Sequence, residues 1–83
     1  MHTGKTVAFI MINTEIGAEE EILNKLREFE NVNEAYIVYG IYDLVVKVEV
    51  ENQDELRSVI MKIRKLERVR STLTILTMEG FQK

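Results

Sequence analysis

The chain has 83 residues, of which 46% are hydrophobic and 30% are charged. This length allows one compact domain, and the composition is too hydrophobic for a disordered segment and too charged for a membrane span. The net charge of −3 excludes a general attraction to nucleic acid or to an anionic membrane, and the absence of cysteine excludes disulfides and thiolate chemistry. A chain this short hides only about 64% of its unfolded surface, so we expect it to associate with other copies. The sequence shows no signal peptide or membrane anchor, and we expect a cytoplasmic protein.

The first half of the chain predicts a strand, a helix and a second strand. Val7–Ile12 is a continuous apolar run, typical of a strand that is buried on both faces. From Ala18 to about Glu30, apolar residues recur at helical spacing, and three glutamates stand in the first turn, where the helix dipole favours carboxylates. Glu34–Tyr39 is a short aromatic and β-branched run, which predicts a strand that ends at Gly40.

The second half predicts the same order of elements. Tyr42–Val50 alternates apolar and polar residues, so it predicts a strand joined to the previous one by a hairpin at Gly40. Asn52 and Glu55 have the spacing of a capping box before an amphipathic helix, and Val69–Met78 alternates threonine with apolar residues, as in a strand. The order β-α-β-β-α-β with right-handed crossovers predicts a ferredoxin-like α+β sandwich. Its antiparallel sheet has the order 4-1-3-2, and both helices cover one face.

A shift of 37 residues, which places Lys25 on Lys62, aligns the two halves. The alignment indicates two related βαβ units, although any two amphipathic helices that lead into strands would look alike. It assigns one set of strand residues to the face under the helices: Val7, Phe9, Met11, Tyr36, Val38, Leu44, Val46, Val48, Leu73 and Ile75. The opposite face of the sheet, here called the open face, then exposes an apolar area of about 550 Å², at the top of the range for monomers.

We therefore expect two copies to dimerise through the open face, as in a dimeric α+β barrel. Burial of this face is worth roughly 14 kcal/mol per chain before the cost of association. The expected interface residues are Ile10, Ile12, Ile37, Val45, Lys47, Glu49 and Leu76. Lys47 and Glu49 are expected to pair across the interface. In an alternative, the C-terminal segment Glu79–Lys83 folds back and covers the open face within one chain.

The sequence offers no catalytic set, so we expect no enzyme, no metal and no cofactor. Serine occurs only at positions 58 and 71, and the single histidine is His2, so a nucleophile with its base cannot be assigned. The four glycines lie too far apart for a nucleotide-binding loop. The consecutive glutamates Glu19–Glu21 point in different directions from a helix and are not placed to share a metal ion.

The segment around the hairpin is the candidate ligand site. Gly40 exposes backbone N–H groups that can bind a carboxylate, and Asp43 can bind an ammonium group, which together describe a zwitterion such as an amino acid. Tyr39 and Tyr42 flank these groups. Hydroxyl groups from the last strand are further candidates: Ser71, Thr72 and Thr74. In the alternative, Gly40 and Asp43 only build the turn, with Asp43 capping a backbone amide.

Residues 32–40 (VNEAYIVYG), 42–48 (YDLVVKV) and 70–74 (RSTLT) lie in the predicted hairpin and last strand. With the order and length of the elements from Val7 to Met78, they resemble the effector-binding or RAM domain of the Lrp/AsnC (feast/famine) transcriptional regulators. The resemblance implies a homodimer through the sheets, octamers or similar rings, and an amino acid bound between dimers near the hairpin. It implies the loop residues Tyr39, Gly40, Tyr42 and Asp43, with the last-strand hydroxyls nearby, as the binding residues.

Regulators of this family carry a helix-turn-helix, for which the lead Met1–Lys5 is too short. We therefore expect a single RAM-like domain over residues 1–83 that does not bind DNA itself. It is expected to modulate transcription through oligomerisation or by joining full-length Lrp/AsnC paralogues. Two alternatives share the fold: an ACT-like amino-acid-binding module, and a small dimeric α+β barrel enzyme that would use Asn13, His2 or Tyr39 as the polar residue inside its barrel.

Overall fold

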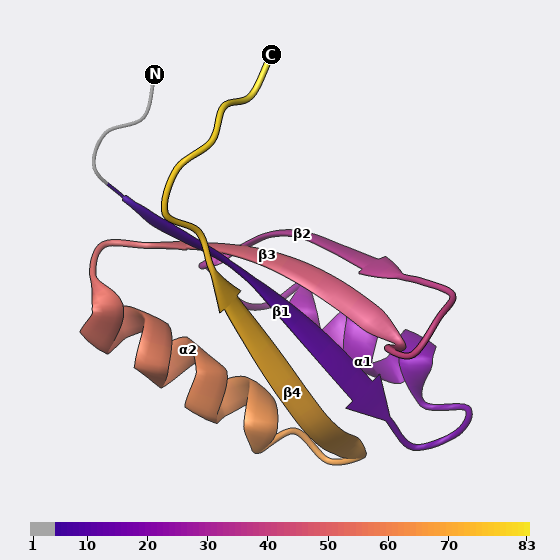
Figure 1. Cartoon of the computed structure of the whole chain (residues 1–83). Helices are drawn as coiled ribbons and strands as arrows, with labels where there is room; N and C mark the ends of the chain where they lie inside the picture. The colour runs from indigo at the N-terminus through magenta and orange to yellow at the C-terminus, as the bar shows by residue number, and fades with distance from the viewer. Residues whose placement is uncertain (1–4) are drawn as a thin grey trace.

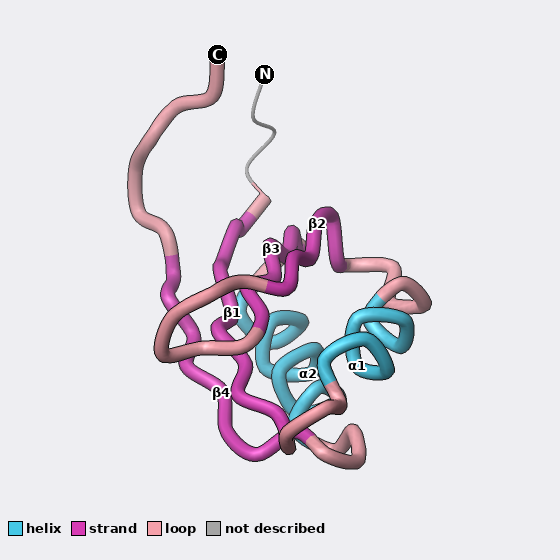
Figure 2. The backbone as a smooth tube through the Cα atoms, turned by 90° about the vertical axis from the view of Figure 1, so that its right-hand side faces the viewer, coloured by secondary structure: helices cyan, strands magenta, loops and turns pink. Residues whose placement is uncertain are grey.

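The computed structural model describes residues 5–83 as one antiparallel sheet with two helices against one of its faces (Figures 1 and 2). The elements in chain order are β1 (Thr6–Thr14), α1 (Glu19–Leu26), β2 (Val32–Ile37), β3 (Leu44–Val50), α2 (Gln53–Arg64) and β4 (Val69–Leu76). The strands have the order β2-β3-β1-β4, which confirms the predicted sheet and the ferredoxin-like fold. His2 lies outside the described residues. Neither described helix is long and apolar enough to cross a membrane.

Local hydrogen bonds determine where α2 begins and where α1 ends. The side chain of Asn52 accepts the N–H of Glu55 at 2.9 Å, and the Glu55 carboxylate accepts the N–H of Glu51 at 2.6 Å, so the predicted cap of α2 is confirmed. Helix α1 is shorter than predicted. After Leu26 the backbone bonds tighten to three-residue spacing, including Phe29 N–H to Leu26 O at 3.1 Å. Phe29 still packs against the core while the chain turns into β2.

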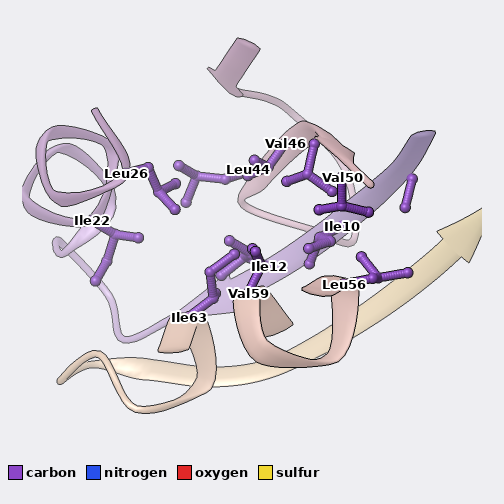
Figure 3. Packing of buried hydrophobic residues seen from close by; sticks show 12 residues of the cluster. Ile10, Ile12, Ile22, Leu26, Leu44, Val46, Val50, Leu56, Val59 and Ile63 are labelled. Atoms are coloured by element: carbon purple, nitrogen blue, oxygen red, sulfur yellow. The ribbon is translucent and has the colours of Figure 1, made fainter. Parts of the chain in front are cut away.

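The core lies between the sheet and the helices, where the side chains in Figure 3 gather. The central strands supply Ala8, Ile10, Ile12, Leu44, Val46, Val48 and Val50, and the helices supply Ile22, Leu26, Leu56, Val59 and Ile63. Ile10 lies opposite Val46 and Ile12 lies opposite Leu44, so these pairs point to the same face. The two central strands and one stripe of each helix therefore form a single core.

The predicted face is confirmed for β3 and wrong for the other strands. Leu44, Val46 and Val48 are buried under the helices, as predicted, but so are Ala8, Ile10 and Ile12 of β1. The repeat shift is an odd number of residues, whereas Ile10 and its facing partner Val46 are an even number apart. Because strand side chains alternate, this difference of one residue moves every side chain of β1 to the other face.

The side chains of the edge strands β2 and β4 also lie on the opposite face of the sheet from the one predicted. The register places Ala35 beside Val46, Thr72 beside Ile12 and Thr74 beside Ile10, all on the helix side. The larger residues of these strands, Tyr36, Leu73 and Ile75, therefore lie on the open face, where about half of each side chain remains exposed. Ala35, Thr72 and Thr74 thus face the helices, while Tyr36, Leu73 and Ile75 stay partly uncovered within one chain.

The open face is apolar, as predicted, but different residues form it. Its apolar members are Val7, Phe9, Met11, Tyr36, Val45, Leu73 and Ile75. Of the expected interface residues, Val45, Lys47 and Glu49 lie on this face. The others lie on the helix side and are corrected here: Ile10 and Ile12 are fully buried, Ile37 lies opposite Leu44, and Leu76 lies opposite Ala8.

The charged residues of the open face have partners within the chain. Lys47 Nζ lies 3.8 Å from Glu34 Oε2, and Asn33 Nδ2 donates to Glu49 Oε1 at 3.3 Å. The Tyr36 hydroxyl also donates to Glu34, at 2.9 Å. This hydrogen bond, together with repulsion from the Glu34 carboxylate, raises the pKa of Tyr36 above its usual value. Lys47 and Glu49 therefore do not need a second chain to find a hydrogen-bonding or ionic partner.

The C-terminal segment does not cover the open face. Figure 1 shows it leaving the sheet beyond β4, and the side chains of Met78 and Phe81 are 96% and 86% exposed. The alternative in which this segment folds back over its own sheet is therefore wrong, and the open face stays uncovered within one chain.

Candidate functional site

The loop between β2 and β3 forms the hairpin predicted at Gly40. The N–H of Val38 donates to the carbonyl of Asp43 at 3.0 Å and closes the loop. Gly40 has φ 130°, a conformation that side-chain-bearing residues rarely adopt. Within residues 5–83, the N–H groups of Gly40, Ile41 and Tyr42 have no hydrogen-bond partner. The loop therefore presents consecutive unpaired amide groups, as the proposed carboxylate site requires.

Asp43 attaches this loop to the end of β1. Its backbone N–H donates to the carbonyl of Ile12 at 2.9 Å, and its Oδ2 accepts the N–H of Thr14 at 2.8 Å. Asp43 thus caps a backbone amide, which is the structural role considered as the alternative from the sequence. Its second oxygen, Oδ1, accepts no hydrogen bond from the part of the chain that the structure describes. One oxygen of Asp43 therefore fixes the loop, and the other has no partner among residues 5–83.

Of the three hydroxyl groups predicted on the last strand, one lies at the same end of β1 as Asp43. Ser71 lies opposite Asn13, whose Nδ2 donates to Ser71 Oγ at 3.4 Å. Thr72 and Thr74 point to the helix side, because they lie opposite the buried Ile12 and Ile10. Since β1 separates β3 from β4, Asp43 and Ser71 lie about 10 Å apart across it. The structure thus groups Asp43 and Ser71 at the end of β1 and leaves Thr72 and Thr74 outside the group.

Sequence reasoning missed the part that β1 plays in this site. Asn13 contacts Ser71 and Thr14 holds Asp43, yet the sequence analysis treated Asn13 only as a polar residue for a barrel enzyme. The available signal was the change from the apolar run Val7–Ile12 to polar residues at the same end of the sheet as the hairpin. A polar strand end beside a hairpin loop is where binding residues commonly gather.

The site is open within one chain. A hollow of about 300 Å³ lies at the other end of the sheet, around Asn31, Glu49 and Glu51, and one of about 360 Å³ lies between α1 and β2. Neither includes the hairpin loop. At the hairpin end, the side chains of Ile16, Tyr39 and Ile41 are almost completely exposed. Residues 5–83 hold no group of three His, Cys, Asp or Glu side chains placed to bind a metal ion. A ligand at the loop would therefore need a second surface to enclose it.

Curated proteins similar in sequence include transcriptional regulators. The HTH-type transcriptional regulator FL11 of Pyrococcus furiosus is 32% identical over 73 residues, which are 88% of this chain and 48% of FL11. The chain therefore spans about half the length of the regulators it matches. A homocitrate synthase of Saccharolobus islandicus is 36% identical over 58 residues, which are only 13% of that enzyme.

Solved structures share the fold along most of the chain. The crystal structure of FFRP-DM1 is 42% identical with a TM-score of 0.85, and the match covers 88% of this chain and 99% of that one. Escherichia coli AsnC is 28% identical with a TM-score of 0.87, covering 93% of this chain and 53% of AsnC. A Neisseria meningitidis transcriptional regulator, solved as its L-Met complex, is 12% identical with a TM-score of 0.86, covers 94% and 53% of the two chains, and shows the fold alone.

The family match extends from the first strand to the last residue. Residues 7–83 match the family described as the Lrp/AsnC ligand binding domain. The match includes every strand and helix described above except the first residue of β1, Thr6, and the hairpin loop with Asp43 lies inside it. The chain belongs to the Lrp/AsnC ligand-binding domain family.

Proposed function

We propose that this chain is a regulatory module that binds a small amino acid at its hairpin loop and acts on transcription through assembly. It would assemble with further copies of itself or with full-length regulators of the same family. The observation that carries the proposal is the juxtaposition of unpaired loop amides with the free Oδ1 of Asp43, in a chain of a ligand-binding family. The module would act on DNA through the regulators with which it assembles.

An amino acid matches the two kinds of group that the loop offers. Asp43 Oδ1 would accept a hydrogen bond from the ammonium group, and the N–H groups of residues 40–42 would donate to the carboxylate. Tyr39 and Tyr42 would flank the ligand, and Ser71 would add a hydroxyl beside Asn13. This site omits Thr72 and Thr74, because the register turns them toward the helices. The match to a family described as a ligand binding domain supports a bound small molecule at this chain's site.

Assembly would supply the second surface that the open site lacks. The open face is the proposed dimer interface, because its apolar residues stay uncovered in one chain and its charged residues are already paired. The exposed Ile16, Tyr39 and Ile41 at the hairpin end would contact a neighbouring dimer, as in an octamer or a similar ring. A ligand that contacts both dimers favours the assembled state by mass action, and assembly raises the affinity for the ligand by the same factor.

Calorimetric titration with a panel of amino acids tests the proposal. Asp43→Asn keeps an oxygen to accept the Thr14 N–H but removes the charge, so it should weaken binding about 10- to 100-fold, the worth of a charge-assisted hydrogen bond. Asp43→Ala should abolish binding and leave the dimer intact. The matched control is Asp54→Asn, since Asp54 is exposed in the first turn of α2 and away from the loop. Equal affinities in the Asp43 variants and the wild type, or no binding of any amino acid, would contradict the proposal.

The similarity to part of a homocitrate synthase favours one second candidate. In this second candidate, the same module binds an amino acid and acts on an enzyme instead of on a transcriptional regulator. Both candidates predict the same calorimetric result, so the distinction needs a mixing experiment. If the chain with its amino acid changes the sedimentation of a full-length Lrp/AsnC regulator, the first candidate is supported, and an unchanged profile favours the second.

A further inference from the structure

The last residues of the chain leave the fold at a well-defined point. Thr77 is the last residue bound to the sheet, through its N–H and its hydroxyl, which donate to the carbonyl of Val7 at 3.1 and 2.7 Å. The segment that follows, Met78–Lys83, is here called the tail. It makes no hydrogen bond or ion pair with the other described residues.

The tail carries two large apolar side chains that nothing covers. Met78 is 96% exposed and Phe81 is 86% exposed, and Lys83 Nζ of the same tail lies 6.0 Å from the centre of the Phe81 ring. Glu79 and Lys83 balance each other in charge, so the tail has no net attraction to nucleic acid or an anionic membrane. Its composition favours an apolar protein surface as the partner.

The direction and reach of the tail point to the side where a second copy would lie. In Figure 2 the tail leaves the end of β4 on the side away from the helices and extends past the end of the sheet. Six extended residues reach about 20 Å, and a sheet packed on the open face would lie about 10 Å away. The tail is therefore long enough to extend from its own sheet onto a facing sheet.

We propose that the tail of each protomer packs onto the open face of a second copy, with Phe81 as the anchor. This inference rests on the proposed open-face dimer and adds a contact to it. In a two-fold dimer both tails make the same contact, so the interface gains two Phe81 anchors. The tail begins beside its own open face and leaves it uncovered, so both the tail and that face are free to pack against another chain.

Sedimentation equilibrium of matched variants tests the contact. Deletion of Met78–Lys83 and the single change Phe81→Ser should each weaken the dimer, the latter by at least about 100-fold when two anchors are lost. Gln82→Ser, a polar neighbour in the same tail, is the control and should leave the dimer constant unchanged. Because the tail makes no hydrogen bond or ion pair with the rest of the described chain, circular dichroism of every variant should match that of the full chain.

Isotope-filtered NMR on a mixture of labelled and unlabelled full-length chains gives a direct readout. The contact predicts intermolecular NOEs between the Phe81 ring and methyl groups of the partner's open face, such as those of Leu73 and Ile75. A full-length dimer without these NOEs, and with the same dimer constant after Phe81→Ser, would overturn the tail contact and leave the dimer proposal standing. NOEs from Phe81 to its own sheet would also overturn it. A full-length chain that stays monomeric at millimolar concentration would overturn both.

Discussion

Replacing Leu73 and Ile75 by alanine in one variant should weaken the proposed open-face dimer by about a thousandfold. Both residues lie on β4 and are 47% and 46% exposed, so about half of each remains to be buried. Full burial of a leucine or isoleucine is worth about 1.5–3 kcal/mol, which leaves about 1 kcal/mol for each exposed half. Two residues in each of two protomers sum to about 4 kcal/mol, which corresponds to about a thousandfold in the dissociation constant.

The assay is sedimentation equilibrium over a series of protein concentrations, with urea unfolding to confirm that each variant is folded. Met61→Ala is the matched control, because Met61 is 47% exposed but lies on α2, on the opposite side of the molecule. Its dimer constant should equal that of the wild type. A double variant that dimerises as tightly as the wild type would refute the assignment of the open face as the interface. An equal weakening by Met61→Ala would show that the effect is not specific to that face.

Further expectations concern local interactions. Asn52→Ala should lower the free energy of unfolding by about 1 kcal/mol in urea denaturation, because α2 loses its cap, and an unchanged midpoint would argue against the cap. Arg68 has φ 76°, so Arg68→Gly should be more stable than Arg68→Ala by about 1 kcal/mol, the reverse of the usual order. The pKa of Tyr36 is raised in the fold. The contribution of Tyr36 to the free energy of unfolding is therefore complete below the ordinary tyrosine pKa and is lost as pH rises through the raised pKa. Glu34→Gln should lower the pKa of Tyr36 in an alkaline absorbance titration, in which Tyr36→Phe identifies its phenolate signal.

The elements and their order were predictable because their signals are local. The cap of α2 depends on two residues three positions apart, and the hairpin depends on one glycine that can adopt a positive φ. Connection lengths and the handedness of crossovers then leave one simple arrangement for two βαβ units, which the sheet order confirms. The end of α1 was less predictable, because Phe29 continues the helical apolar spacing although the chain has already begun to turn.

The candidate site was predictable in part for the same reason. Gly40 and Asp43 stand out within a few residues of one another, and the structure keeps them in one loop. The partners of that loop lie far away in sequence. Asp43 accepts a hydrogen bond from the N–H of Thr14, and Ser71 accepts one from Asn13 on the neighbouring strand. Such pairings depend on the register between strands, which no local pattern specifies.

The sequence by itself determined the order of strands and helices, the sheet order and the presence of an apolar surplus on one face. Only the tertiary structure decided which residues form that surplus. Ile10 and Phe9 are neighbours in an unbroken apolar run, so composition does not distinguish the core residue from the surface one. Pairing of β1 with β3 does distinguish them, because side chains alternate along a strand and a register change of one residue exchanges the two faces.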